Sequence, residues 1–251
     1  MHGEAGENSQ VTIHIGTSGW SYPHWDGVLY PHGLPPERRL DHYLPRFCTA
    51  ELNASYYRWP TDRAFEHWRQ RLPADFLLSV KAPGALTHRK RLYAPEQWVA
   101  RMARGLGRLG DRRGPLLVQL PPGAAIDEPR LSYFLGRVPR ALRVAVEFRN
   151  PTWHQDRIFD LLEDYGAAYC VMSGAGLPCV LRATASFAYV RLHGPDHRHM
   201  YAGSYSDDDL RWWADRIREW QSQGRDVFAY FNNDGEGHAV RNALTLRSLL
   251  D

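Results

Sequence analysis

The stretch LLVQLPPGAAIDEPRLSYFLGRVPRALRVAVEF, residues 116–148, decides the fold class. It begins and ends with short apolar runs, Leu116–Leu120 and Val144–Phe148, and an amphipathic segment, Glu128–Val138, lies between them. A buried strand, a helix and a second buried strand form the βαβ unit of a parallel sheet. The stretch therefore predicts an α/β protein.

The same unit repeats in both directions along the chain. The sequence predicts strands at Thr12–Thr17, Ala50–Ser55, Phe76–Lys81, Leu116–Leu120, Val144–Phe148, Ala168–Met172, Ala188–Leu192 and Val227–Phe231. It predicts helices at Pro35–Phe47, Asp62–Leu72, Pro95–Leu109, Glu128–Val138, Arg157–Tyr165, Ser206–Gln223 and His238–Leu250. Residues 173–186 are rich in Gly, Pro and small side chains, so we expect the helix between strands six and seven to be short or missing. Eight such units predict one (β/α)8 TIM-barrel domain over residues 11–251, after a disordered tail at residues 1–10.

Composition narrows the classes of function. The chain has 251 residues, 43% of them hydrophobic, and its apolar runs are too short to cross a bilayer, so we expect no membrane partner. The formal charge of +3 is too small to imply nucleic-acid binding by itself. The three cysteines form no C-x-x-C motif, and no signal peptide is visible, which indicates a cytoplasmic protein.

Lysine is rare in this chain. Lys81 and Lys90 are the two lysines among 31 basic residues, and all the others are Arg. A coding bias explains the excess of Arg. A lysine that persists against such a bias indicates a position where Arg cannot replace it.

Alternate residues of a barrel strand face the helices and the barrel interior. One parity is almost wholly apolar: Ile13, Ile15, Leu52, Ala54, Leu78, Val80, Leu116, Val118, Leu120, Val144, Val146, Val190, Leu192, Ala229 and Phe231. The other parity, predicted to face inward, contains His14, Gly16, Ser18, Glu51, Asn53, Ser55, Ser79, Lys81, Gln119, Glu147, Arg149, Tyr189, Arg191, His193, Tyr230 and Asn232. An ordinary barrel interior is filled with Val, Ile and Leu.

These inward charges allow two interpretations. They can pair with one another as an internal salt-bridge network, or they can form a ligand site. We favour the ligand site, because most of the polar residues lie toward the C-terminal ends of the strands, where barrel enzymes build their active sites.

Seven motifs, taken together, carry a family resemblance. They are Gly16–Tyr22 with Trp25, Glu51–Tyr57, Lys81–Pro83 with Thr87-His88, Gln119–Pro122, Glu147–Arg149 with Trp153, Tyr189–Gly194 with Tyr201–Gly203, and Tyr230–Asp234 with Asn242. The chain resembles the YecE-like family, known as domain of unknown function 72. The resemblance implies a TIM barrel and supplies no reaction. Tyr56 departs from the family pattern, which more often has Phe there.

We predict an enzyme that acts on a polar, anionic small molecule, phosphorylated or sugar-containing, through hydrolase or isomerase chemistry. The acid–base candidates are Glu51, Lys81, Glu147 and His193. The ligand-binding candidates are Ser18, Trp20, Asn53, Tyr57, His88, Gln119, Arg149, Trp153, Arg191, Tyr201, Asn232, Asn233 and Asp234. Within this set, Lys81, Arg149 and Arg191 are expected to hold the anion.

No metal or other cofactor is expected. The cations at these positions repel a metal ion, and the Gly16–Gly19 turn matches no nucleotide-binding fingerprint. Two alternatives remain open. One is a nucleic-acid-processing enzyme of the metal-dependent endonuclease kind, with the aromatic loops and His88–Arg91 gripping a strand. The other is a non-catalytic barrel that binds a ligand or a partner.

Overall fold

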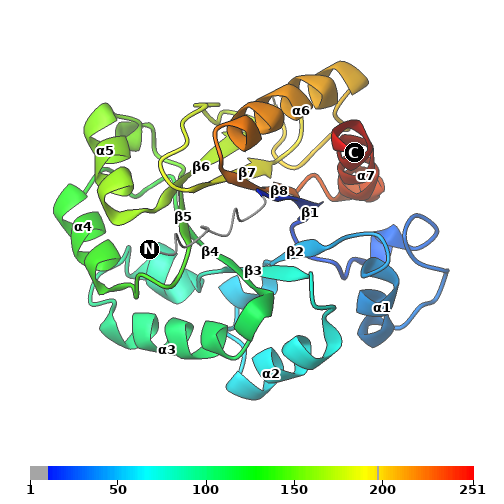
Figure 1. The fold of residues 1–251 in the computed structure, drawn as a ribbon, viewed down its shortest axis with the longest axis horizontal. Coiled ribbons are helices and arrows are strands. Elements are labelled where there is room, and N and C mark those ends of the chain that lie inside the picture. The colour runs from blue at the N-terminus through cyan, green and yellow to red at the C-terminus, as the bar shows by residue number, and fades with distance from the viewer. Residues whose placement is uncertain (1–10, 197) are drawn as a thin grey trace, which may run out of the picture.

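The computed structural model describes residues 11–196 and 198–251. The predicted tail at residues 1–10 lies outside the described residues. Eight parallel strands form one sheet in the order β1-β8-β7-β6-β5-β4-β3-β2 (Figure 1). They are β1 (Ile13–Thr17), β2 (Thr49–Leu52), β3 (Leu77–Lys81), β4 (Arg113–Leu120), β5 (Val144–Phe148), β6 (Ala168–Ser173), β7 (Phe187–Leu192) and β8 (Asp226–Phe231). The predicted α/β barrel is confirmed.

The helices surround the sheet, as Figure 1 shows. They are α1 (Arg39–Tyr43), α2 (Asp62–Arg71), α3 (Glu96–Gly107), α4 (Glu128–Arg137), α5 (Asp156–Tyr165), α6 (Asp207–Ser222) and α7 (His238–Leu250). Residues 174–186, all described, connect β6 to β7 without a helix, as predicted. Gly176 adopts a left-handed φ of 64°, which continues no helix.

The barrel closes between β1 and β2 through a seam that has no regular ladder. The two strands meet in one isolated bridge, Ser18 with Glu51. The buried Tyr43 hydroxyl replaces the missing ladder bonds, because it accepts from Thr17 N at 3.1 Å and donates to Thr49 O at 2.9 Å. Gly16 permits this approach, since a Cβ there would collide with the Thr49 carbonyl oxygen. The seam thus depends on one side chain of α1.

Two apolar layers follow the predicted strand parity. The larger lies between sheet and helices and includes Leu78, Val118 and Val190. The smaller fills the barrel interior and is made of Leu117, Ala145, Ala168, Cys170, Met172, Ala185, Phe187, Tyr189, Phe228 and Tyr230. Large aromatic rings fill the barrel interior near the N-terminal ends of the strands. The polar inward residues therefore lie toward the C-terminal ends.

The structure corrects two boundaries. The strand predicted to reach Ser55 ends at Leu52, and Ala54–Tyr56 forms a 3-10 turn. The Ser55 side chain stabilises the turn that follows β2. Its hydroxyl donates to Leu52 O at 2.7 Å or to Lys81 O at 2.6 Å. The helix predicted over Pro35–Phe47 is only a 3-10 turn followed by the five-residue α1.

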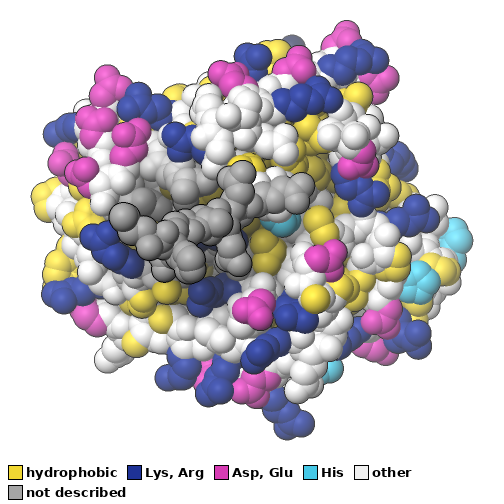
Figure 2. Space-filling model, viewed as in Figure 1, with side chains coloured by type: hydrophobic (Ala, Val, Ile, Leu, Met, Phe, Trp, Pro, Cys, Tyr) yellow, Lys and Arg dark blue, Asp and Glu magenta, His cyan; other side chains and the backbone are white. Residues whose placement is uncertain are grey.

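The face of the molecule in Figure 2 carries Lys and Arg side chains interspersed with Asp and Glu around the outer helices. Mixed charge of this kind is typical of an ordinary solvated surface. Within the described part of the chain, no helix is both long enough and apolar enough to span a bilayer.

Candidate functional site

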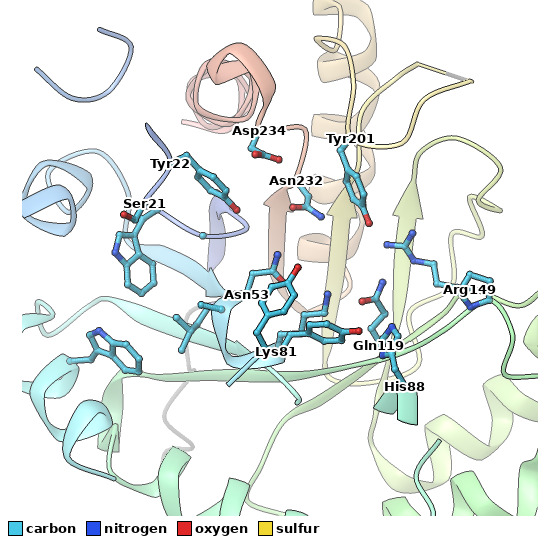
Figure 3. A pocket seen from close by; sticks show the side chains of 18 residues that line it. Ser21, Tyr22, Asn53, Lys81, His88, Gln119, Arg149, Tyr201, Asn232 and Asp234 are labelled. Carbon is cyan, nitrogen blue, oxygen red and sulfur yellow. The ribbon is translucent and has the colours of Figure 1, made fainter. Parts of the chain in front are cut away.

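A cavity of about 820 Å³ lies at the C-terminal ends of the strands (Figure 3). Ten of the predicted site residues line it: Trp20, Asn53, Tyr57, Lys81, His88, Gln119, Arg149, Tyr201, Asn232 and Asp234. Each lies near the end of a strand or in the loop that follows one. The volume is within the range of pockets that hold small molecules.

The two sides of this cavity differ in chemistry. Aromatic side chains follow β1 and β2, and Trp68 of α2 joins them, with its ring edge-on to Trp20 at 6.3 Å. The lining residues from β3, β4 and β5 include the basic or polar side chains Lys81, His88, Gln119 and Arg149. In Figure 3, Tyr22 lies on one side, His88 and Arg149 lie on the other, and Lys81 projects between them. A ligand in this cavity meets an apolar wall and a basic wall.

Arg191 is the centre of a charge network inside the barrel. Its Nε and Nη2 donate to the two carboxylate oxygens of Glu51 at 3.0 and 2.8 Å, and its Nη1 donates to Glu147 at 2.6 Å. None of the three side chains is exposed to solvent. One guanidinium on β7 therefore joins carboxylates on β2 and β5.

Both carboxylates have further donors. Ser18 Oγ and Tyr189 OH donate to Glu51 at 2.6 and 2.7 Å. Gln119 Nε2 donates to Glu147 at 3.0 Å, and Arg149 pairs with the same oxygen. Burial alone would raise the pKa of each carboxyl, but the nearby arginines and hydrogen bonds outweigh it and lower both pKa values. The two carboxylates are ionised and fully paired.

His193 lies at the edge of this network and is also fully buried. Its Nδ1 is 3.2 Å from Asn232 Nδ2, and its Nε2 is 3.1 Å from Arg149 Nη2 and 3.6 Å from Glu147. Burial lowers the pKa of His193 to about 4, although Glu147 opposes the shift. The imidazole is neutral at pH 7.

Lys81 differs from the other cations. It ends β3 and lines the cavity, and its side chain lies over the Tyr56 ring, with Nζ 4.9 Å from the ring centroid. Among the described residues, no carboxylate oxygen lies within 4.0 Å of this amine. Burial, helped by Arg191 and opposed by Glu147 and Glu51, lowers its pKa to about 7. The amine therefore exchanges a proton near neutral pH.

The remaining predicted site residues do not line the cavity. Ser18, Glu51, Glu147, Arg191 and His193 form the paired layer beneath it. Asn233 ties the end of β8 to Gly203 O and Asn242, at 2.9 and 3.0 Å. Trp153 stacks on Phe148 at 4.7 Å, donates to Ala124 O, and borders a separate cavity of about 200 Å³.

The sequence did not single out Trp68, Ser21, Leu52, Ala54 or Pro122 as lining residues. Trp68 belongs to the apolar stripe of α2, and its periodicity is that of a core residue. Ala54 was assigned to the outward parity of a longer β2, but because the strand ends at Leu52 it is exposed at the cavity. No signal in the sequence distinguishes either residue.

The glycine-rich turn after β1 does not offer free amides to an anion. Ser18 N donates to Phe231 O at 2.8 Å and Gly19 N donates to Glu51 O at 2.7 Å. Of the basic turn after β3, His88 lines the cavity and Lys90 is exposed. In the loop after β7, His199 is exposed beside Asp196, and His197 lies outside the described residues. Over the described chain, no three His, Cys, Asp or Glu side chains are grouped to hold a metal ion.

Comparisons with known proteins agree with this architecture. The chain is 29% identical to UPF0759 protein YunF of Bacillus subtilis (strain 168), over 95% of each chain. A DUF72 family protein of Thermotoga maritima MSB8 superposes with a TM-score of 0.84 at 28% identity, over 95% of this chain and 99% of the other. A DUF72 family protein of Enterococcus faecalis V583 shares the fold, with a TM-score of 0.82 at 17% identity over 95% of each chain. The family model described as "Protein of unknown function DUF72" matches residues 14–251, so this chain belongs to that family.

Proposed function

We propose that this protein is an enzyme that acts on a small, polar, anionic molecule, phosphorylated or sugar-containing, in the 820 Å³ cavity. One observation carries the proposal: Lys81 reaches the cavity as a basic group without a carboxylate partner among the described residues. Buried charges normally pair with an opposite charge. An anionic ligand would supply that partner.

The charge balance of the site supports an anion. Glu51 and Glu147 are matched by Arg191 and Arg149, so these four charges cancel. Lys81 adds a positive charge whenever it is protonated, and Asp234, a further carboxylate that lines the cavity, lies beside His24 at 3.4 Å and is not within 4.0 Å of this amine. An anion that contacts Nζ of Lys81 would raise the pKa of the amine. Binding of the anion would therefore be accompanied by protonation of Lys81.

The opposite wall supports a ligand with a ring or an apolar face. Flat aromatic surfaces against which a sugar ring can stack are offered by Trp20, Trp68 and the half-buried side chains of Tyr22 and Tyr56. Amide side chains at Asn53, Gln119 and Asn232 border the same space and can bind hydroxyl groups. We propose that these amides orient the ligand.

We assign proton transfer to Lys81, because a pKa of about 7 suits general acid–base catalysis at neutral pH. Glu51, Glu147 and His193 then act as positioning residues. Their buried contacts hold Arg191 and Arg149 in place, and the charges of this network shift the pKa of Lys81.

Sulfate is the sharpest first probe, because its charge does not change between pH 5 and 9. We expect wild-type protein to bind sulfate and, more tightly, a sugar phosphate such as ribose 5-phosphate, as measured by calorimetry and by tryptophan fluorescence. Lys81→Met removes a charge-assisted contact and should weaken both by roughly 10- to 100-fold. Lys90→Met is the matched control and should bind as the wild type does.

The pH dependence has a definite sign. Sulfate affinity should be highest below pH 7 and should fall as pH rises, because Lys81 of the ligand-free protein loses its proton near pH 7. Equal affinity of wild type and Lys81→Met for every anion tested would contradict the proposal. Tight binding of a single-stranded oligonucleotide without binding of any small anion would favour the nucleic-acid alternative instead.

A further inference from the structure

We propose that Lys81 is an amine nucleophile, and that the substrate is a carbonyl compound that forms an imine with its Nζ. This inference rests on the proposed function, because it uses the same cavity and the same anionic class of ligand. It adds the functional group on which the chemistry acts, an aldehyde or ketone.

The surroundings of Lys81 are those of a reactive amine. Its side chain is 8% exposed, borders the cavity, and packs over the Tyr56 ring with no acidic partner within 4.0 Å in the described chain. Lysine becomes nucleophilic when it is desolvated or placed beside other cations, since both favour the neutral amine. Arg191 and Arg149 supply those cations, and the charges of Glu51 and Glu147 are held by the arginines.

The residue type supports the same role. Arg stands at every basic position except Lys81 and Lys90, and Lys90 is exposed in a loop. Arg can replace Lys as a cation that holds an anion, but a guanidinium neither loses its proton at neutral pH nor forms an imine. Imine formation and proton transfer both require a lysine at position 81, whereas anion binding alone does not.

The step balances as a condensation. The lone pair of neutral Nζ forms a bond to the carbonyl carbon, and the carbonyl π electrons move to oxygen, which takes up one of the two amine protons to give a carbinolamine. The carbinolamine then expels this oxygen, and both hydrogens of the amine leave with it as water. Protonation of the imine nitrogen gives an iminium that withdraws electrons from the adjacent carbon.

His88 is placed to transfer these protons. Its ring is edge-on to the same Tyr56 ring that Lys81 covers, at 4.8 Å, and it lines the cavity. Thr87 Oγ1 lies 3.2 Å from Pro83 O and 2.9 Å from His88 Nδ1, and when its hydroxyl donates to Pro83 O, His88 donates to it from Nδ1. This tautomer leaves Nε2 as a free acceptor, with no hydrogen-bond partner among the described residues. Burial also lowers the pKa of His88, helped by Lys81, so it is a neutral base at pH 7.

Reductive trapping tests the proposal. Full-length protein is incubated at pH 7 with pyruvate or glyceraldehyde 3-phosphate and cyanoborohydride, and the adduct is located by mass spectrometry of peptides. With only two lysines in the chain, Lys90 serves as an internal comparison for non-specific reaction. We expect Lys81 to be modified at least about tenfold faster than Lys90, with a rate that rises through pH 7 and levels off above it.

Two controls separate this proposal from the one before it. Sulfate should slow the reaction at Lys81 and leave Lys90 unaffected, and Lys81→Arg should give no adduct at position 81 while remaining folded by circular dichroism. If sulfate binds but Lys81 and Lys90 react equally with both carbonyl compounds, imine formation is wrong and anion binding stands. If sulfate fails to bind and trapping at Lys81 still succeeds, the amine is reactive and the anionic class of ligand is wrong.

Discussion

Arg191 and Glu51 meet across the inside of the barrel as a two-point pair, with Nε to Oε2 at 3.0 Å and Nη2 to Oε1 at 2.8 Å. Their strands, β7 and β2, are not neighbours in the sheet, and the β1–β2 seam lies between them. The pair therefore bridges the part of the barrel that has the fewest backbone hydrogen bonds. Glu147 on β5 extends the bridge to a third strand.

Breaking this network should destabilise the fold. Glu147→Gln leaves Arg149 and half of Arg191 without their buried counter-charge, which typically costs about 3–5 kcal/mol. Urea unfolding followed by circular dichroism measures the loss. The control is Glu163→Gln, which breaks an exposed pair with Arg182 and should change stability by about 0–1 kcal/mol. Equal effects of the two substitutions would contradict the burial of the network.

The seam offers a second prediction. Tyr43→Phe removes the hydroxyl that joins Thr17 N to Thr49 O and leaves two buried backbone groups unpaired. We expect a loss of about 1–3 kcal/mol. Tyr165→Phe is the control, because that hydroxyl bonds Ser132 at an exposed site. An unfolding midpoint for Tyr43→Phe equal to that of the control would mean that water replaces the hydroxyl.

The sequence predicts the barrel well because strand parity and βα alternation are local signals. Leu78 and Val118 face the helices as their positions require, and Tyr189 and Tyr230 face inward. The seam could not be predicted in the same way. It depends on Tyr43, which lies in a region where the sequence predicts a longer helix, and on a contact between residues that are distant in the chain.

The third prediction concerns the pH dependence of stability. An unfolded lysine keeps its proton up to about pH 10.4, whereas Lys81 in the folded protein releases it near pH 7. Between these values the unfolded chain binds more protons, so this group makes stability rise with pH. The groups that act on Lys81 are Arg149, Arg191, Glu51 and Glu147. His88 is close enough for Lys81 to lower its pKa in turn.

Lys81→Met removes this dependence. The melting temperature of wild type minus that of Lys81→Met should increase from pH 7 to pH 10, and Met should be the more stable residue below pH 7. Using the difference cancels the titration of tyrosines and cysteines that the two proteins share. A difference that stays constant over this range would show that Lys81 keeps an ordinary pKa in the folded protein.

The site is only partly readable from the sequence. Parity places Glu51, Glu147, Arg191 and His193 inside the barrel, but it does not tell which charges pair. Arg191 contacts two carboxylates, and Lys81 has no acidic partner among the described residues. Which charges pair depends on distances in the folded barrel, and sequence spacing does not encode these distances. The rarity of lysine, by contrast, is a signal in the sequence alone, and it points to Lys81.

The last prediction is that Lys81→Arg is not a conservative change. Lys81 is nearly buried and packs over the Tyr56 ring, so a longer, planar guanidinium must displace this ring or enter the cavity. It also adds a permanent third guanidinium beside Arg149 and Arg191, where lysine becomes neutral near pH 7. We expect a lower melting temperature than wild type, with a gap that widens from pH 6 to pH 9, because only lysine can lose its charge. A gap that is constant with pH would assign the effect to packing alone.

The control is Lys90→Arg at the exposed turn, which should match wild type at every pH. If Lys81→Arg melts as wild type does across this range and binds sulfate with unchanged affinity, then position 81 requires only a positive charge, and the amine has no role that a guanidinium cannot fill.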